Sequence, residues 1–165
     1  MWLLDCPTTT DELTTAMATS RSHPYIDTIQ EYYRGCNTGD IELMMSTFCD
    51  DIVHYFVDHT AVRGAAALAN YWFKVGPTTQ ANWQLDHAVV QEPEAVIEWS
   101  MRWVPAATGK PELLRGSEWY LFADGRIAEI RSYHDNFYLQ NPDNRQLWEF
   151  DYAQRGYRTL EPNPR

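Results

Sequence analysis

The sequence has few cysteines, no basic run and no long apolar segment. Its three cysteines, Cys6, Cys36 and Cys49, are an odd number without a C-x-x-C pair. This argues against a disulfide framework or a zinc ribbon and favours a reducing compartment. The N-terminal residues lack a basic region and hold only a three-residue apolar run. We therefore expect neither a signal peptide nor a membrane span, and a cytoplasmic location.

Positive charge is also scarce, because the formal net charge is −10. Such a surface repels phosphate backbones and anionic lipids, so we expect neither nucleic acid nor a membrane as partner. Glycine-rich phosphate loops and a G-x-S-x-G elbow are missing. The spacing of His54, Asp58 and His59 matches no recognised ligand set, so we expect no cofactor and no metal.

Aromatic residues are abundant, at 14% of the 165 residues, with seven Trp and ten Tyr. The length fits one domain of ordinary size. Trp and Tyr combine a large apolar body with one polar atom, which suits a pocket for a flat ligand, although they also suit a core or an interface.

Helical patterns come first along the chain and strand patterns follow. Apolar residues from Tyr25 to Cys36 predict a helix, Asp40 caps a second short one, and a third begins at Gly64 and stops at Gly76-Pro77. Five segments predict strands: 51–59, 82–91, 95–104, 112–122 and 126–135. This order indicates an α+β fold with helices on one face of an antiparallel sheet.

Four short motifs carry a resemblance to a known family. They are N-T-G-D-I-E-L-M, D-D-I-V-H-Y-F, V-R-G-A-A-A-L and F-A-D-G-R-I-A-E-I-R-S-Y, in that order. Together they resemble the cone-shaped family of nuclear transport factor 2, ketosteroid isomerase, scytalone dehydratase and SnoaL-like polyketide cyclases. The resemblance implies a strongly curved antiparallel sheet that encloses a cavity with three N-terminal helices. It also implies a homodimer, which we expect to pair through Arg115, Trp119, Leu121, Arg131 and Tyr133.

The predicted domain spans residues 23–136. Residues 1–22 form an N-terminal extension. The tail, 137–165, is rich in aromatic residues, so we expect it to pack on the domain or on the dimer partner, where its apolar area is covered.

The resemblance also implies site residues. Tyr32 and Glu118 fall at the two oxyanion-donor positions of ketosteroid isomerases, and Tyr55 falls where those enzymes carry their aspartate base. His134 takes the place of a pocket-lining aromatic residue, and Asn82 that of a scytalone dehydratase histidine. The replacement of the aspartate removes the isomerase proton shuttle and favours a lyase.

Strand alternation gives an independent argument for the same pocket. It places His134 with Ser132 and Ile130 on one face of the last strand. A carboxyl group in an apolar pocket can stay neutral and donate a proton, and histidine is the natural general base. The candidate catalytic residues are therefore His134, Glu118, Tyr55, Tyr32 and Asp58. The candidate substrate-binding residues are Trp72, Tyr120, Phe122 and Asn82.

Alternatives remain open at this stage. Glu118 could instead pair with Arg102, Arg115 or Arg131, and His134 could be a structural histidine. Asp58 or His59 could be the base. The predicted function is a cofactor-independent lyase or isomerase, dehydratase- or cyclase-like, that acts on a small apolar cyclic or aromatic carbonyl or hydroxy compound. The alternative is a non-catalytic binding or assembly module.

Overall fold

The computed structural model describes residues 23–57, 59–106, 108–134, 147–152 and 154–155. The predicted extension, Asp58 and most of the tail lie outside these ranges. Helix α2, Pro24–Thr38, begins with a proline in its first turn and is capped by His23, whose Nδ1 accepts from the Tyr25 amide at 3.2 Å. Helix α3, Ile41–Ser46, has the predicted Asp40 cap, which accepts from the Leu43 amide at 2.9 Å.

Helix α4, Ala65–Thr79, continues past Gly76-Pro77, where the sequence predicted a stop. That prediction was wrong. A proline inside a helix removes one backbone donor and leaves a carbonyl without its usual partner. Here threonine hydroxyls supply donors near that point: Thr78 donates to the Lys74 carbonyl at 3.0 Å and Thr79 to the Val75 carbonyl at 2.8 Å. The helix runs one turn further than predicted and ends at Gln80, which adopts the left-handed conformation.

The strands form one six-stranded sheet of order β2-β1-β6-β5-β4-β3. Their bounds are β1 Phe48–Phe56, β2 Val62–Arg63, β3 Asn82–Gln91, β4 Glu94–Trp103, β5 Glu112–Ala123 and β6 Arg126–His134. The sheet is mixed rather than wholly antiparallel, because β1 pairs with β6 in parallel. No hairpin joins these two strands, since α4 and the β3–β6 meander lie between them in the chain.

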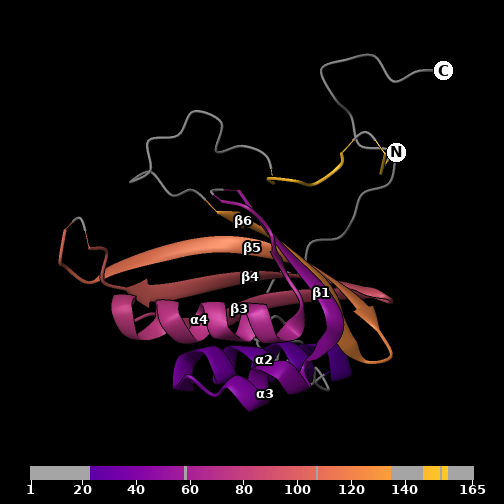
Figure 1. Cartoon of the computed structure of the whole chain (residues 1–165), viewed down its shortest axis with the longest axis horizontal. Helices are drawn as coiled ribbons and strands as arrows, with labels where there is room; N and C mark the ends of the chain where they lie inside the picture. The colour runs from indigo at the N-terminus through magenta and orange to yellow at the C-terminus, as the bar shows by residue number, and fades with distance from the viewer. Residues whose placement is uncertain (1–22, 58, 107, 135–146, 153, 156–165) are drawn as a thin grey trace, which may run out of the picture.

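The three helices cover one face of the curved sheet (Figure 1). The main core lies between the helices and the sheet. It includes Ile29, Met44, Phe48, Leu68 and Ile130, which are fully buried. This arrangement confirms the α+β cone predicted from the sequence, with an open sheet. No helix within the described ranges is long and apolar enough to span a membrane.

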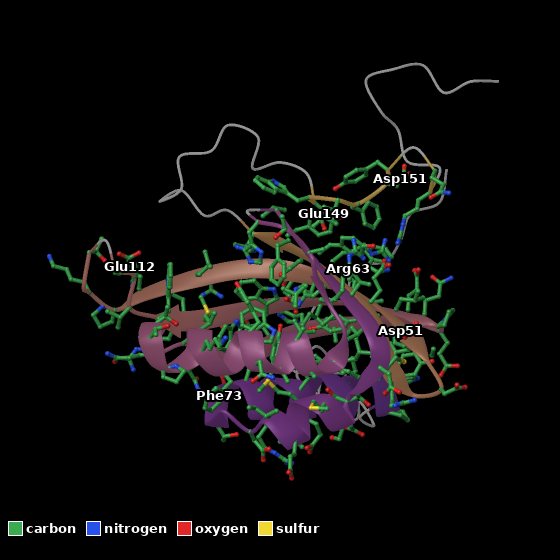
Figure 2. All side chains as sticks on the ribbon, in the orientation of Figure 1. Asp51, Arg63, Phe73, Glu112, Glu149 and Asp151 are labelled. Atoms are coloured by element: carbon green, nitrogen blue, oxygen red, sulfur yellow. The ribbon has the colours of Figure 1, made fainter. Side chains whose placement is uncertain are left out.

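A second, smaller core lies on the outer face of the sheet, away from the helices. There Leu147 and Phe150 of the tail pack against Tyr55 and Val57, and Figure 2 shows Glu149 and Asp151 on that side. The Trp148 amide donates to the Phe56 carbonyl at 2.9 Å. The described part of the tail thus extends the sheet's outer layer.

The same segment covers part of the surface expected to pair two subunits. Arg131 is buried, with its guanidinium 5.7 Å from the Phe150 ring, and Tyr133 packs against the second core. Arg155 binds both carboxylate oxygens of Glu129, at 2.9 and 2.8 Å. Of the expected pairing residues, Arg131 and Tyr133 therefore already contact the chain's own tail.

The second core gives a stability prediction. Phe150→Ala should lower the free energy of unfolding by about 3 kcal/mol, the lower end for a buried phenylalanine, because this core lies near the surface. Trp148→Ala is the matched control, since Trp148 is 38% exposed and the change keeps the backbone amide that donates to Phe56. Urea denaturation measures both, and equal losses for the two variants would contradict the packing role of Phe150.

Candidate functional site

Glu118 is the polar centre of the space between sheet and helices. It lies on the inner face of β5, where it is 5% exposed and pairs across the sheet with Ile97 and Ser132. Three hydroxyl groups donate to its carboxylate. Tyr33 donates to Oε2 at 2.8 Å, Tyr120 makes a short hydrogen bond to the same oxygen, and Ser132 donates to Oε1 at 2.8 Å. Oε2 is thus shared by two donors, and Oε1 keeps capacity for a proton or a ligand.

Burial raises the pKa of the Glu118 carboxyl above its ordinary value, because water no longer solvates the charge. The hydroxyl donors and the nearby His134 act in the opposite direction. Burial also holds the pKa values of Tyr33 and Tyr120 well above the usual range, so both phenols stay protonated donors. His54 adds a further polar group, with its Nε2 3.9 Å from Oε1.

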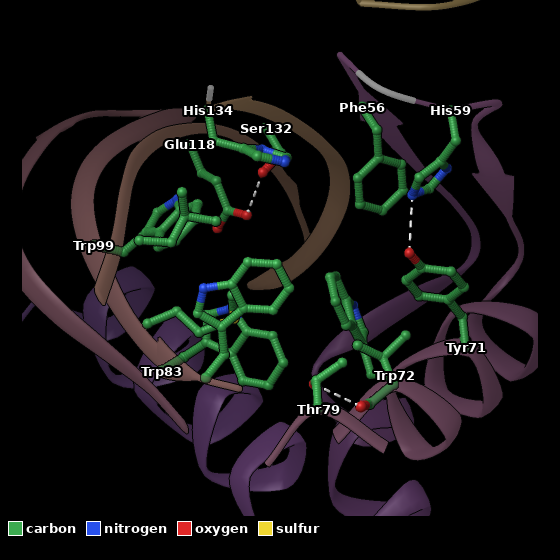
Figure 3. Close-up of a pocket in the computed structure, with 14 residues that line it drawn as sticks. Phe56, His59, Tyr71, Trp72, Thr79, Trp83, Trp99, Glu118, Ser132 and His134 are labelled. Atoms are coloured by element: carbon green, nitrogen blue, oxygen red, sulfur yellow. Dashed lines mark hydrogen bonds between the residues drawn. The ribbon is translucent and has the colours of Figure 1, made fainter. Parts of the chain in front are cut away.

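Glu118, Ser132 and His134 line one cavity of about 150 Å³. Figure 3 shows the three side chains converging on one side of it. Most of the remaining lining is aromatic or apolar and includes Phe56, Trp72, Trp83, Trp99, Met101 and Trp103. The arrangement presents ionisable groups to a ligand inside an apolar enclosure, where electrostatic interactions are strong.

The alternative pairing of Glu118 with an arginine is not what the structure shows. Arg115 lies 3.7 Å from Asp86, and Arg131 lies 3.2 Å from Glu129. The Glu118 carboxylate instead accepts from hydroxyl groups.

Two predicted catalytic tyrosines lie elsewhere. Tyr32 is buried in the helix–sheet core, with its ring centroid 5.1 Å from that of Phe48 and 5.4 Å from that of Tyr33. The hydrogen bond to Glu118 comes from Tyr33, while burial raises the pKa of Tyr32 and the nearby Glu118 charge adds to this rise. Tyr55 lies on the outer face of β1 against Phe150. Alternation places His54 and Phe56 on the inner face.

The predicted substrate-binding residues separate in the same way. Trp72 lines the cavity. Tyr120 lies behind Glu118 and holds it, while Phe122 stacks on Tyr25 with centroids 3.8 Å apart. Asn82 is exposed, because the alternation of β3 turns Trp83 inward. Neither Tyr120, Phe122 nor Asn82 is among the residues that line the cavity.

Residues that sequence reasoning left without a role complete the site. Tyr33 and Ser132 hold Glu118, and Tyr71 lines the cavity beside His59. Ser132 lies on the same strand face as His134, so strand alternation could have predicted its place in the site. No sequence pattern could have predicted the roles of Tyr33 and Tyr71, because these depend on how the helices are rotated against the sheet. Among the described residues, no group of His, Cys, Asp or Glu side chains could hold a metal ion.

Gly116 gives Trp99 its position in the wall. A Cβ on Gly116 would lie 2.5 Å from Trp99 Cζ2 and 2.8 Å from the Tyr133 carbonyl oxygen, both closer than atoms tolerate. Gly116 also pairs with His134 across β5 and β6. A side chain at this position would therefore displace both the wall and the strand that carries His134.

We expect Gly116→Ala to lower the free energy of unfolding by about 1–3 kcal/mol, the usual cost of overpacking, and to weaken ligand binding in the cavity. Gly76→Ala is the control, since its new Cβ would make only an ordinary 3.6 Å contact with the Cys36 carbonyl. Within α4 the gain in helix propensity is opposed by the ring of Pro77, which disfavours a Cβ on the preceding helical residue, so this change should cost less than Gly116→Ala. Urea denaturation measures the free energy of unfolding of both variants. A Gly116→Ala protein as stable as wild type would contradict the close approach of Gly116 to Trp99.

Comparisons with known proteins agree with this fold. A family model described as "SnoaL-like domain" matches residues 29–130. The chain is similar to a protein of unknown function with a cystatin-like fold from Methylobium petroleophilum PM1, at 34% identity over 86% of this chain and 95% of that one, with a TM-score of 0.70. No curated protein matches the sequence.

Two more distant structures share the fold alone. One is TerC co-crystallized with polyporic acid, at 16% identity over 72% of this chain and 96% of that one, with a TM-score of 0.62. The other is a candidate polyketide cyclase from Xanthomonas campestris pv. campestris, at 21% identity over 68% and 90% of the two chains, with a TM-score of 0.58.

Proposed function

The chain belongs to the SnoaL-like domain family, and on that premise we propose that it is a cofactor-independent lyase or isomerase that acts by general acid–base chemistry. Its substrate is a small cyclic or aromatic carbonyl or hydroxy compound. One observation carries the proposal: the buried Glu118 carboxyl lies beside His134 in a cavity walled by tryptophans. Family membership alone would not select a reaction, because one fold hosts many.

The size of the cavity limits the enclosed part of the substrate. A closed apolar cavity of about 150 Å³ accommodates one benzene-sized ring, and the cavity here has about that volume. The aromatic walls offer ring faces for stacking. We therefore propose that one six-membered ring is enclosed and that larger substituents extend outward. The TerC structure, which holds polyporic acid, supports the use of this fold for cyclic ligands.

The proposed chemistry divides between two residues. His134 removes a proton from the carbon next to a carbonyl, since imidazole accepts protons well near neutral pH. Glu118, whose pKa is raised by burial, donates a hydrogen bond or a proton from Oε1 to the developing enolate oxygen. Tyr33 and Tyr120 hold Oε2 and so fix the carboxyl plane. A hydroxyl group on the carbon β to the carbonyl then leaves as water with the proton that His134 took up, which gives a dehydration. Return of that proton to a different carbon gives an isomerisation instead.

Proton exchange tests this proposal without knowledge of the natural substrate. Acetophenone incubated with the protein in D₂O should gain deuterium at the carbon next to its carbonyl, measured by NMR. A set of cyclic hydroxy-ketones should then show dehydration or isomerisation. Binding of these compounds without exchange at any pH between 5 and 9 would reject catalysis and leave a binding module.

A cytoplasmic location and a homodimer are further parts of the proposal. Because the tail covers Arg131 and Tyr133, the pairing surface would lie nearer Trp119 and Leu113, which are 39% and 57% exposed. Light scattering at micromolar concentration tests the dimer, and a monomer mass would reject it. Cell fractionation tests the location.

A further inference from the structure

The cavity has a second pair of polar groups, His59 and Tyr71, which the proposed chemistry does not use. The Tyr71 hydroxyl oxygen lies 2.8 Å from His59 Nε2, and both residues line the cavity. Figure 3 shows them across the cavity from Glu118 and His134, with Trp72 between the two groups. The aromatic enclosure thus has polar groups at two ends.

The backbone fixes the direction of this hydrogen bond. His59 Nδ1 lies 2.8 Å from the Thr60 carbonyl oxygen, which can only accept, so Nδ1 carries a hydrogen. In the neutral imidazole Nε2 then has a lone pair and accepts the hydroxyl hydrogen of Tyr71. A phenolic oxygen that donates its own hydrogen can also accept one, so a hydroxyl group of the ligand suits this end of the cavity better than a carbonyl group.

We propose that Tyr71 and His59 form a second proton-transfer unit, which accepts the proton of a ring hydroxyl on the substrate. The inference rests on the proposed function, and it specifies the substrate class: a single ring with a carbonyl group near Glu118 and a hydroxyl group near Tyr71. Tyr71 is the catalytic residue that touches the hydroxyl, and His59 is the residue to which Tyr71 passes a proton.

The transfer balances without a further reactant. The O–H bond of the substrate breaks and its proton binds to the Tyr71 oxygen. The original Tyr71 proton moves to His59 Nε2, which becomes an imidazolium, and the substrate oxygen keeps the electron pair. In the reverse direction the imidazolium returns its proton to Tyr71, which protonates the substrate oxygen. The pair can therefore take up a proton in one step and restore it in another.

Conjugation through the substrate ring would connect the two units in one cavity. An oxyanion at one end of a conjugated ring pushes electron density toward a carbonyl at the other end. There Glu118 can stabilise the oxygen that gains the charge. A ligand that fills the space between the tryptophans would displace water from it, which would strengthen both interactions.

Two probes of matched size test the inference: 4-hydroxyacetophenone and 4-methylacetophenone. Wild-type protein should bind the hydroxyl probe about 10-fold more tightly by calorimetry, the usual worth of one good hydrogen bond. At pH 7 the bound hydroxyl probe should show the absorption band of its phenolate.

Tyr71→Phe should remove both the preference and the phenolate band. His59→Gln keeps an acceptor for Tyr71 but takes up no proton, so it should keep much of the preference and lose the band. Tyr25→Phe is the matched control, because Tyr25 packs on Phe122 away from the cavity lining. It should match wild type.

Equal binding of the two probes by wild type, or a phenolate band that persists in Tyr71→Phe, would overturn the inference. Deuterium exchange of acetophenone by wild-type protein is measured alongside. If exchange occurs while the phenolate test fails, only the Tyr71–His59 inference is overturned. If the phenolate band forms and is lost in Tyr71→Phe while exchange is absent, the second unit stands and the enolisation proposal fails.

Discussion

His134→Ala is expected to lower the rate of deuterium exchange into acetophenone by about 10²–10⁴-fold, the range for loss of a general base. The imidazole lies in the cavity near Glu118, and alanine leaves no group there to accept the proton. Binding should change far less than the rate, because the tryptophan walls remain. The reduction should therefore appear in kcat and hardly in KM.

His87→Ala is the matched control for this rate. His87 is an exposed histidine on β3 that does not line the cavity, so its loss should leave exchange unchanged. NMR at saturating acetophenone measures all three proteins. An exchange rate for His134→Ala within about threefold of wild type would remove His134 from the mechanism and direct attention to His59.

Glu118→Leu is expected to lower the free energy of unfolding by about 4 kcal/mol or more. The change leaves the hydroxyl groups of Tyr33, Tyr120 and Ser132 buried without their shared acceptor. Each unsatisfied buried polar group costs about 1–3 kcal/mol. Glu118→Gln keeps the shape and one acceptor oxygen, so it should cost far less. Similar losses for the Leu and Gln variants in urea denaturation would show that the hydroxyl groups find other partners.

The difference in the free energy of unfolding between wild type and Glu118→Gln should also depend on pH. Burial raises the folded-state pKa of Glu118 above its unfolded value, which is about 4.3 for a glutamate. Between these two values the folded state binds more protons, so its stability falls as pH rises. The contribution is fully present below the unfolded pKa and is lost as pH passes the folded pKa. The Gln variant should lack this fall.

The alternation of side chains along the strands was the best guide to the face of the sheet on which each site residue lies. Glu118, Ser132 and His134 lie in stretches of β5 and β6 that pair without a register shift, so a period of two places each on its correct face. The β5–β6 shift falls beyond them, between Leu121 and Phe122. The same rule, applied to β3, would have predicted Trp83 rather than Asn82 as the residue that lines the cavity.

Counting by resemblance placed Tyr32 in the main core, but the hydrogen bond to Glu118 comes from its neighbour Tyr33. In β1 the residues on the inner face are His54 and Phe56, next to Tyr55, because one residue along a strand changes the face. Tyr71 and His59 could not be paired from sequence, because His59 lies between β1 and β2 and Tyr71 lies on α4, so their approach depends on how these elements pack.

Strand β6 is held from both faces, and this links the tail to the cavity. Arg131 and Tyr133 contact the tail on the outer face, while Ser132 and His134, which alternate with them, line the cavity. Any ligand that shifts this end of β6 must work against the packing of Phe150. If a ligand shifts this end of β6, thermodynamic reciprocity makes the coupling equal in both directions: the docking of Leu147 and Phe150 would change the affinity of the cavity by the same factor by which an occupied cavity changes that docking.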